Sequence, residues 1–95
     1  MSDDVEYEEG DDNTVAGGTA VEVLEYLAKS LVDDPDSLEV EVDDSRTPIR
    51  LNVHAAPDDL GRLIGRRGRV ATAIRTVVRA AASRDDMTVD VEFVD

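Results

Sequence analysis

The chain of 95 residues contains no cysteine and a single histidine. Without cysteine there can be no disulfide framework and no thiolate metal site, and His54 cannot form a metal site alone. The sequence also lacks an apolar run of membrane-spanning length and the apolar core of a signal peptide. We therefore expect a cytoplasmic protein that uses no metal, no cofactor and no membrane.

Groups suited to catalysis are also scarce. The chain has no GK[ST] phosphate motif and no pairing of a nucleophile with a base. The acids that alternate with apolar residues over residues 37–43 are typical of a solvated sheet face, not of a catalytic carboxylate pair. We do not expect an enzyme.

Acidic and basic residues are separated along the chain. The net charge of −13 alone disfavours a nucleic-acid partner, because one polyanion repels another. However, residues 1–45 carry sixteen acids and one base, whereas residues 46–84 carry nine arginines and two acids. At physiological salt the Debye length is about 8 Å, so local charge governs binding. An anionic ligand is therefore expected at the basic central segment.

Residues 1–18 have the composition of a disordered acidic tail. They hold seven acids, no base and few apolar groups, which is too little to form a core. We expect residues 19–95 to form one domain. A domain of this size lies near the lower limit for one stable core, so dimerisation would be an ordinary way to bury more surface.

Apolar residues at helical spacing predict three helices. Thr19 and Glu22 fit a capping box at the start of the first helix, and Pro35 marks its end. Pro57 suits the first position of the second helix. The apolar faces expected in the core are Ala20, Val23, Leu24, Leu27, Ala28 and Leu31; Leu60, Leu63 and Ile64; and Val70, Ala73, Ile74, Val77, Val78 and Ala81.

Alternating apolar and polar residues predict strands over residues 37–43, 49–55 and 89–93. The first two strands can pair as an antiparallel hairpin, and a helical crossover makes the last strand parallel to the second. The predicted fold is α+β in the order α-β-β-α-α-β, with a three-stranded mixed sheet and the helices packed on one of its faces.

A Gly-Arg-Arg-Gly sequence at residues 65–68 joins the second helix to the third. Gly65 allows a left-handed conformation at the helix end, and Gly68 allows the backbone to approach a ligand closely. The next helix begins with unpaired amides and the positive end of its dipole, which attract phosphate. The formal charges beside this helix start come from Arg66, Arg67 and Arg69.

The glycine spacing alone is a weak signal, because chance gives about 0.4 such patterns in a chain of this length. An ordinary turn between two helices is the alternative interpretation. The absence of any acid between Arg62 and Arg84 favours a loop that grips the backbone of a nucleic acid. Arg75 and Arg79 are one helical turn apart, a mildly unfavourable spacing that is explained either by a partner or by a solvated face.

The run LIGRRGR at residues 63–69 resembles the Ile-Gly-x-x-Gly signature of KH domains, and the order of elements resembles their prokaryotic, type II arrangement. The segments LVDDP at residues 31–35 and GRVATAIRTVV at residues 68–78 are similar to segments of the KhpA family, small bacterial RNA-binding proteins with one KH domain. The resemblance extends over about residues 19–94.

The resemblance implies binding of single-stranded RNA, with the loop clamping about four nucleotides of backbone beside a groove for the bases. It also implies an RNA chaperone or post-transcriptional regulator linked to cell elongation and envelope homeostasis, a homodimer, and pairing with a KhpB-like KH protein. Aromatic residues make up 3% of the chain, so little stacking and little sequence preference are expected. A protein-interaction module that mainly dimerises or docks on a partner is the alternative. The residues assigned to RNA binding are Leu60, Arg62, Ile64, Gly65, Arg66, Arg67, Gly68, Arg69, Val70, Ile74 and Arg75.

Overall fold

The computed structural model describes residues 18–95, and the expected acidic tail lies outside them except for Gly18. The element order is the one that the hydrophobic pattern predicts. The elements are α2 (Gly18–Leu31), β1 (Glu39–Asp43), β2 (Ile49–His54), α3 (Pro57–Ile64), α4 (Arg69–Arg84) and β3 (Val89–Phe93), with short 3₁₀ helices at Pro35–Ser37 and Arg66–Gly68.

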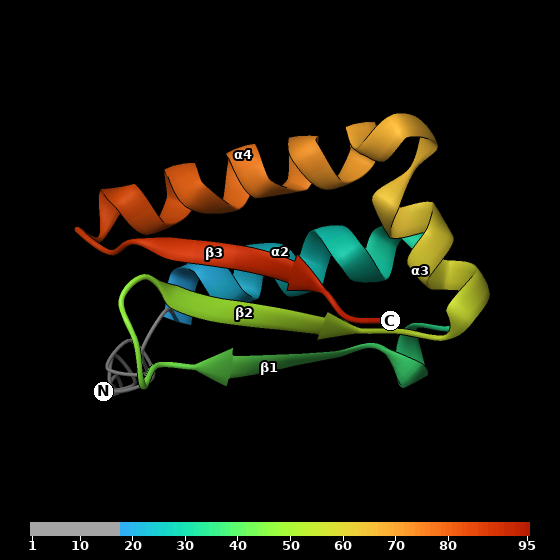
Figure 1. Ribbon diagram of the computed structural model, residues 1–95, viewed down its shortest axis with the longest axis horizontal. Helices are drawn as coiled ribbons and strands as arrows, with labels where there is room; N and C mark the ends of the chain where they lie inside the picture. The colour runs from blue at the N-terminus through green and yellow to red at the C-terminus, as the bar shows by residue number, and fades with distance from the viewer. Residues whose placement is uncertain (1–17) are drawn as a thin grey trace, which may run out of the picture.

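The three strands form one mixed sheet in the order β1-β2-β3 (Figure 1). β1 is antiparallel to β2, with Val40 opposite Val53, and β2 is parallel to β3, with Leu51 opposite Val91. This arrangement confirms the predicted hairpin and the predicted parallel crossover. It also places β2 in the centre, where it pairs on both sides.

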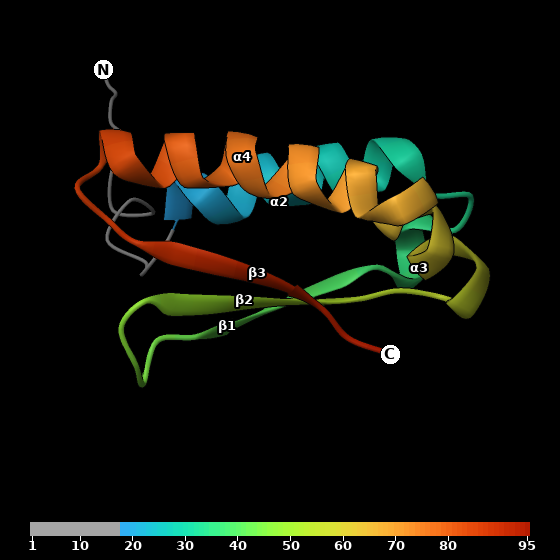
Figure 2. The ribbon, with the colours of Figure 1, turned by 45° about the horizontal axis from the view of Figure 1, so that its top comes forward.

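α2 and α4 lie over the same face of the sheet, and no helix of residues 18–95 covers the opposite face (Figure 2). The predicted α+β fold with helices on one face is therefore confirmed. None of the helices in this range is long and apolar enough to cross a membrane. The core between the two layers consists of Ala20, Leu24, Ala28, Leu38, Leu51, Val53, Leu63, Ile74, Val78, Ala82, Val89 and Val91.

Two details of the helices differ from the prediction. Thr19 is an exposed residue inside α2, so the predicted capping box is wrong. Leu31, Ile64 and Val77 are 44%, 38% and 47% exposed, and Ala73 is also exposed, although we expected all four in the core. The apolar stripe on these helices is wider than the strip that the sheet covers, so its outer edge remains at the surface.

Asp59 is the only buried charged residue among residues 18–95, with 2% of its surface exposed. Its Oδ1 and Oδ2 atoms accept the backbone N–H groups of Asp33 and Asp34, each at 3.0 Å. Arg62 Nη1 donates to Oδ1 at 2.7 Å. The Asp33 N–H holds the pKa of the Asp59 carboxyl below its usual value; the Asp34 N–H and Arg62 act in the same direction, against burial. The carboxylate thus ties the chain leaving α2 to the first turn of α3.

We predict that Asp59→Asn lowers the melting temperature at pH 7 by several degrees, because an amide cannot accept from all three donors. A lowered native pKa means that the carboxylate stabilises the fold fully above about pH 4 and that this contribution is lost as the pH falls through the native pKa. Thermal melts followed by circular dichroism from about pH 7 to pH 2 should therefore show a weaker acid destabilisation in the variant.

The matched control is Asp58→Asn, which changes an exposed aspartate in the same helical turn. This variant loses only an interaction with the dipole of α3, about 0.3–1 kcal/mol, so its melting temperature should stay closer to that of the unmodified chain than the Asp59→Asn value does. Asp43, whose pKa is lowered by the Ser45 hydroxyl, is present in both variants and contributes equally to their acid response. An unchanged melting temperature for Asp59→Asn at pH 7 would show that the carboxylate does not hold α3 in place.

Candidate nucleic-acid interface

The turn at residues 65–68 reverses the chain through three residues with positive φ; Arg67 and Gly68 are left-handed, whereas Gly65, with ψ 175°, is not in the left-handed conformation predicted for it. The φ angles are 75° at Gly65, 59° at Arg67 and 72° at Gly68. The Gly65 N–H donates to the Gly61 carbonyl at 2.9 Å, and the Gly68 N–H donates to the Gly65 carbonyl at 3.1 Å. A left-handed conformation costs a residue with a Cβ atom roughly 1–2 kcal/mol. The strain at Arg67 is therefore held by a tight turn, as is common at functional sites.

The two glycines of the turn serve different purposes. A Cβ atom at Gly65 would lie 2.8 Å from Val70 Cβ and 3.0 Å from Val70 N, and it would also collide with Val70 Cγ2. At Gly68, no atom lies within 4 Å of the position that a Cβ would occupy. Gly65 thus lets the turn pack on α4, whereas the surface beside Gly68 is open to a ligand.

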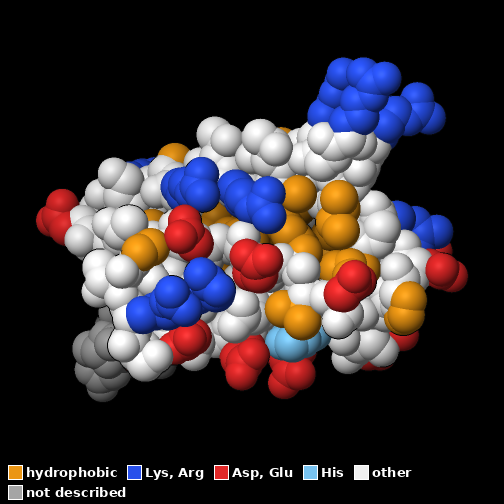
Figure 3. All heavy atoms as spheres, in the orientation of Figure 1, with side chains coloured by type: hydrophobic (Ala, Val, Ile, Leu, Met, Phe, Trp, Pro, Cys, Tyr) orange, Lys and Arg blue, Asp and Glu red, His pale blue; other side chains and the backbone are white. Residues whose placement is uncertain are grey.

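Arg66, Arg67 and Arg69 are exposed, and none of them is in an ion pair among residues 18–95. Figure 3 shows basic side chains projecting from the end of the molecule where α3 meets α4. The turn is therefore a concentrated positive charge without an acidic neighbour in the described part of the chain.

The amides at the start of α4 are less available than we expected. The Gly68 N–H is bonded within the turn, and the Arg69 N–H donates to the Arg66 carbonyl. Val70 N lies against Gly65. No side chain of residues 18–95 caps this helix, so within this range the positive end of its dipole remains uncompensated. Attraction for an anion therefore comes mainly from the arginine side chains and the dipole.

The site residues predicted on α3 lie in three different environments. Arg62 pairs with Asp59 and, through Nη2, with Asp33 Oδ2 at 3.0 Å, so it is held at the junction of α2 and α3. Leu60 is 6% exposed and supports the helix from inside. Ile64, at the end of α3, is the member of this group that a ligand at the turn could touch.

Arg75 lies at the seam between α4 and β3. Its Nε donates to the Val91 carbonyl at 3.0 Å, and its guanidinium lies 5.3 Å from the centre of the Phe93 ring. Arg79, one turn further, pairs with Asp90 at 3.2 Å. Arg75 and Arg79 repel each other on α4, but each of them is therefore stabilised by a partner on β3.

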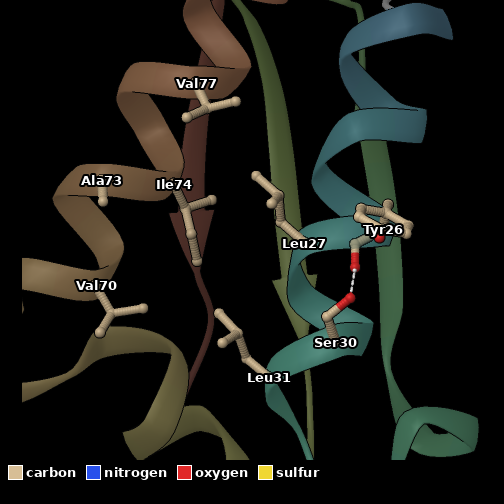
Figure 4. Close-up of a pocket in the computed structure, with 8 residues that line it drawn as sticks. All are labelled: Tyr26, Leu27, Ser30, Leu31, Val70, Ala73, Ile74 and Val77. Carbon is tan, nitrogen blue, oxygen red and sulfur yellow. Dashed lines mark hydrogen bonds between the residues drawn. The ribbon is translucent and has the colours of Figure 1, made fainter.

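Val70 and Ile74 lie on the other side of α4, in an apolar groove between α2 and α4 (Figure 4). The groove has a volume of about 350 Å³, and none of the described residues that line it is charged. The Ser30 hydroxyl donates to the Tyr26 carbonyl at 2.7 Å at its edge. We did not predict a groove between these two helices, because Leu27, Leu31 and Val77 were assigned to the core, and Val70 and Ile74 were assigned to the RNA site as well. Its lining residues are Tyr26, Leu27, Ser30, Leu31, Val70, Ala73, Ile74 and Val77.

A family profile described as KhpA/KhpB, KH domain matches residues 21–93. The chain belongs to the KhpA/KhpB family of KH domains. The chain is 45% identical to RNA-binding protein KhpA of Clostridium acetobutylicum over 73 residues. These residues cover 77% of this chain and 97% of the relative. The corresponding protein of Borreliella burgdorferi is 37% identical over 78 residues, covering 82% and 95%. That of Mycobacterium tuberculosis is 45% identical over 64 residues, covering 67% and 80%.

These relatives confirm the family that the LIGRRGR run resembles. The family domain, residues 21–93, contains the arginine turn, the seam between α4 and β3, and the groove between α2 and α4. The acidic residues 1–17 lie outside it.

The geometry of the turn predicts unequal costs for the two glycines. Gly68→Ala meets open space and should lower the free energy of unfolding only by the left-handed strain, about 1–2 kcal/mol. Gly65→Ala adds a collision with Val70, and overpacking typically costs a further 1–3 kcal/mol. Urea unfolding of both variants measures the difference. Equal losses would show that close packing on Val70 is not what requires glycine at residue 65.

Proposed function

We propose that this chain binds single-stranded RNA, with the turn at residues 65–68 holding the phosphodiester backbone. The observation that carries the proposal is the set of three exposed arginines, unpaired within residues 18–95, at an uncapped helix start. Guanidinium groups form bidentate, charge-assisted hydrogen bonds with phosphate oxygens. The name of the relatives, RNA-binding protein KhpA, supports the same function.

The bases would lie on the face between α4 and β3, next to the turn. This seam offers polar groups of Arg75, and the exposed side chain of Ile64 lies at the end of α3, directly before the turn, whereas the groove on the other side of α4 is apolar. The Phe93 ring is covered by a guanidinium, so little aromatic surface is free for stacking. Contacts of this kind give modest affinity and little sequence preference, which suit an RNA chaperone or post-transcriptional regulator in the cytoplasm. A link to cell elongation and envelope homeostasis is implied by the family resemblance alone.

We further propose that the groove between α2 and α4 binds a second copy of the chain. Three of the four large apolar residues that are exposed among residues 18–95, Tyr26, Leu31 and Val77, border this groove. Charged residues make up 35% of the chain, yet none of those within residues 18–95 lines the groove. Burial of such a face is what a small domain with a limited core gains from dimerisation. A KhpB-like KH protein is the other candidate occupant, and dimerisation without RNA binding is the alternative function.

Replacing Arg66 and Arg67 with Asp should weaken the binding of a short single-stranded RNA by at least about tenfold, because each hydrogen bond to a charged group contributes roughly 1.5–3 kcal/mol. If three or four phosphates are contacted, the log–log salt slope is about −2 to −3, and the variant should have a shallower slope. Fluorescence anisotropy across a salt series measures both quantities.

The matched control replaces Arg46 and Arg84 with Asp, which changes the net charge equally at two exposed positions outside the turn. This control should retain most of the affinity. Equal losses in the two double variants would mean that net charge, not the turn, attracts RNA. Binding that is nearly independent of salt would exclude phosphate contacts at the arginines.

Val77→Glu should convert a dimer into a monomer, because it places a charge in the apolar groove. Sedimentation equilibrium at micromolar concentrations measures the change, and Thr76→Glu, an exposed neighbour outside the groove, is the control. The variant should still bind a short RNA. A chain that remains monomeric without any substitution would refute docking of a second copy.

A further inference from the structure

The acidic segment Met1–Gly17 has one electrostatically suitable place to bind on its own domain. It holds seven acids and no base, whereas residues 18–95 hold sixteen acids and ten bases. The domain is thus itself net negative and repels the segment over most of its surface. An attractive contact requires a group of basic side chains that nearby acids do not neutralise.

Among the described residues, the arginine turn is the group that meets this requirement. Lys29 lies one helical turn after Glu25 in α2, Arg50 lies between Asp43 and Asp90 in the sheet register, and Arg75 is bonded to the Val91 carbonyl. Arg62 and Arg79 pair with aspartates. Arg46 follows Asp44 in the β1–β2 turn, and Arg84 is followed directly by Asp85. The three arginines at the start of α4 have no acid beside them, and they project away from the acidic parts of the surface (Figure 3).

The segment is long enough to reach the turn. Gly18 begins α2 at the end of the domain opposite the α3–α4 junction (Figure 1). The 16 residues of α4, which run between these two ends, span about 24 Å. Seventeen residues extend to at most about 56–61 Å. A coil of 17 residues has a root-mean-square length of about 21–25 Å, which matches the span.

We propose that the segment Met1–Gly17 binds the arginine turn of its own chain and competes there with RNA phosphates. Carboxylates accept the same bidentate hydrogen bonds from guanidinium groups that phosphates do. A tether of this length gives an effective concentration in the millimolar range, so even a weak contact is populated. The family domain begins at residue 21, so this control would be an addition to that domain. The proposed competition depends on the proposed RNA binding at the turn. The proposed contact between the acidic segment and the turn does not depend on it.

The contact can be tested without RNA by paramagnetic relaxation enhancement. Because the chain has no cysteine, Ser2→Cys provides a single site for a nitroxide label. At about 10 mM salt, where the Debye length is about 30 Å, the label should broaden the amide signals of residues 65–69. The broadening should vanish at about 0.5 M salt and in the Arg66→Asp, Arg67→Asp variant. Broadening confined to Arg46 or Arg84, or none at all, would overturn the proposal.

Competition is measured by replacing the seven acids of the segment with Asn and Gln in the full chain. At low salt this variant should bind a short single-stranded RNA about three- to tenfold more tightly, as expected for removal of a millimolar competitor. The difference should disappear at high salt. Equal affinities at low salt would refute competition while leaving RNA binding intact. If neither chain binds RNA, the proposed function fails, and the relaxation experiment still decides whether the contact exists.

Discussion

The buried carboxylate of Asp59 is the interaction on which the position of the arginine turn depends. α3 has only eight residues, and a helix of this length is not stable by itself. At its start it is held by the Asp33 and Asp34 amides, which belong to the chain leaving α2. At its end it is held by the close packing of Gly65 on Val70. With both ends fixed, the turn is presented as a rigid projection, and fewer degrees of freedom are lost when a ligand binds.

Val70 links the two surfaces that we assign to RNA and to a second copy of the chain. Its side chain lies directly under Gly65, and it also lines the groove between α2 and α4. The seam with Arg75 and Phe93 lies on the other flank of α4. A second copy in the groove would therefore lie next to the turn without covering the seam. This geometry allows RNA binding and dimerisation to occur together.

The fold could be predicted from the sequence because its signals are local. Strand alternation and helical spacing determine the elements, and short connections leave one simple topology. The LIGRRGR run likewise indicated the turn and its arginines. The position of Asp59 could not be predicted in this way, since its partners, the amides of Asp33 and Asp34, are about 25 residues away and carry no side-chain signal. The same limit applies to Leu31 and Val77, because periodicity shows which face of a helix is apolar but not how much of it the sheet covers.

The separation of charge explains how a polyanionic protein could bind a polyanion at one place only. On the outward face of the sheet, the register aligns Glu41 with Asn52 and Glu92, and Asp43 with Arg50 and Asp90. No helix in the described part of the chain covers this face, and its acids outnumber its bases, so it repels RNA that approaches from that side (Figure 2). At physiological salt this repulsion extends about 8 Å and does not reach across the helical layer to the turn. The acids of the sheet therefore oppose non-specific adsorption without weakening the arginine turn.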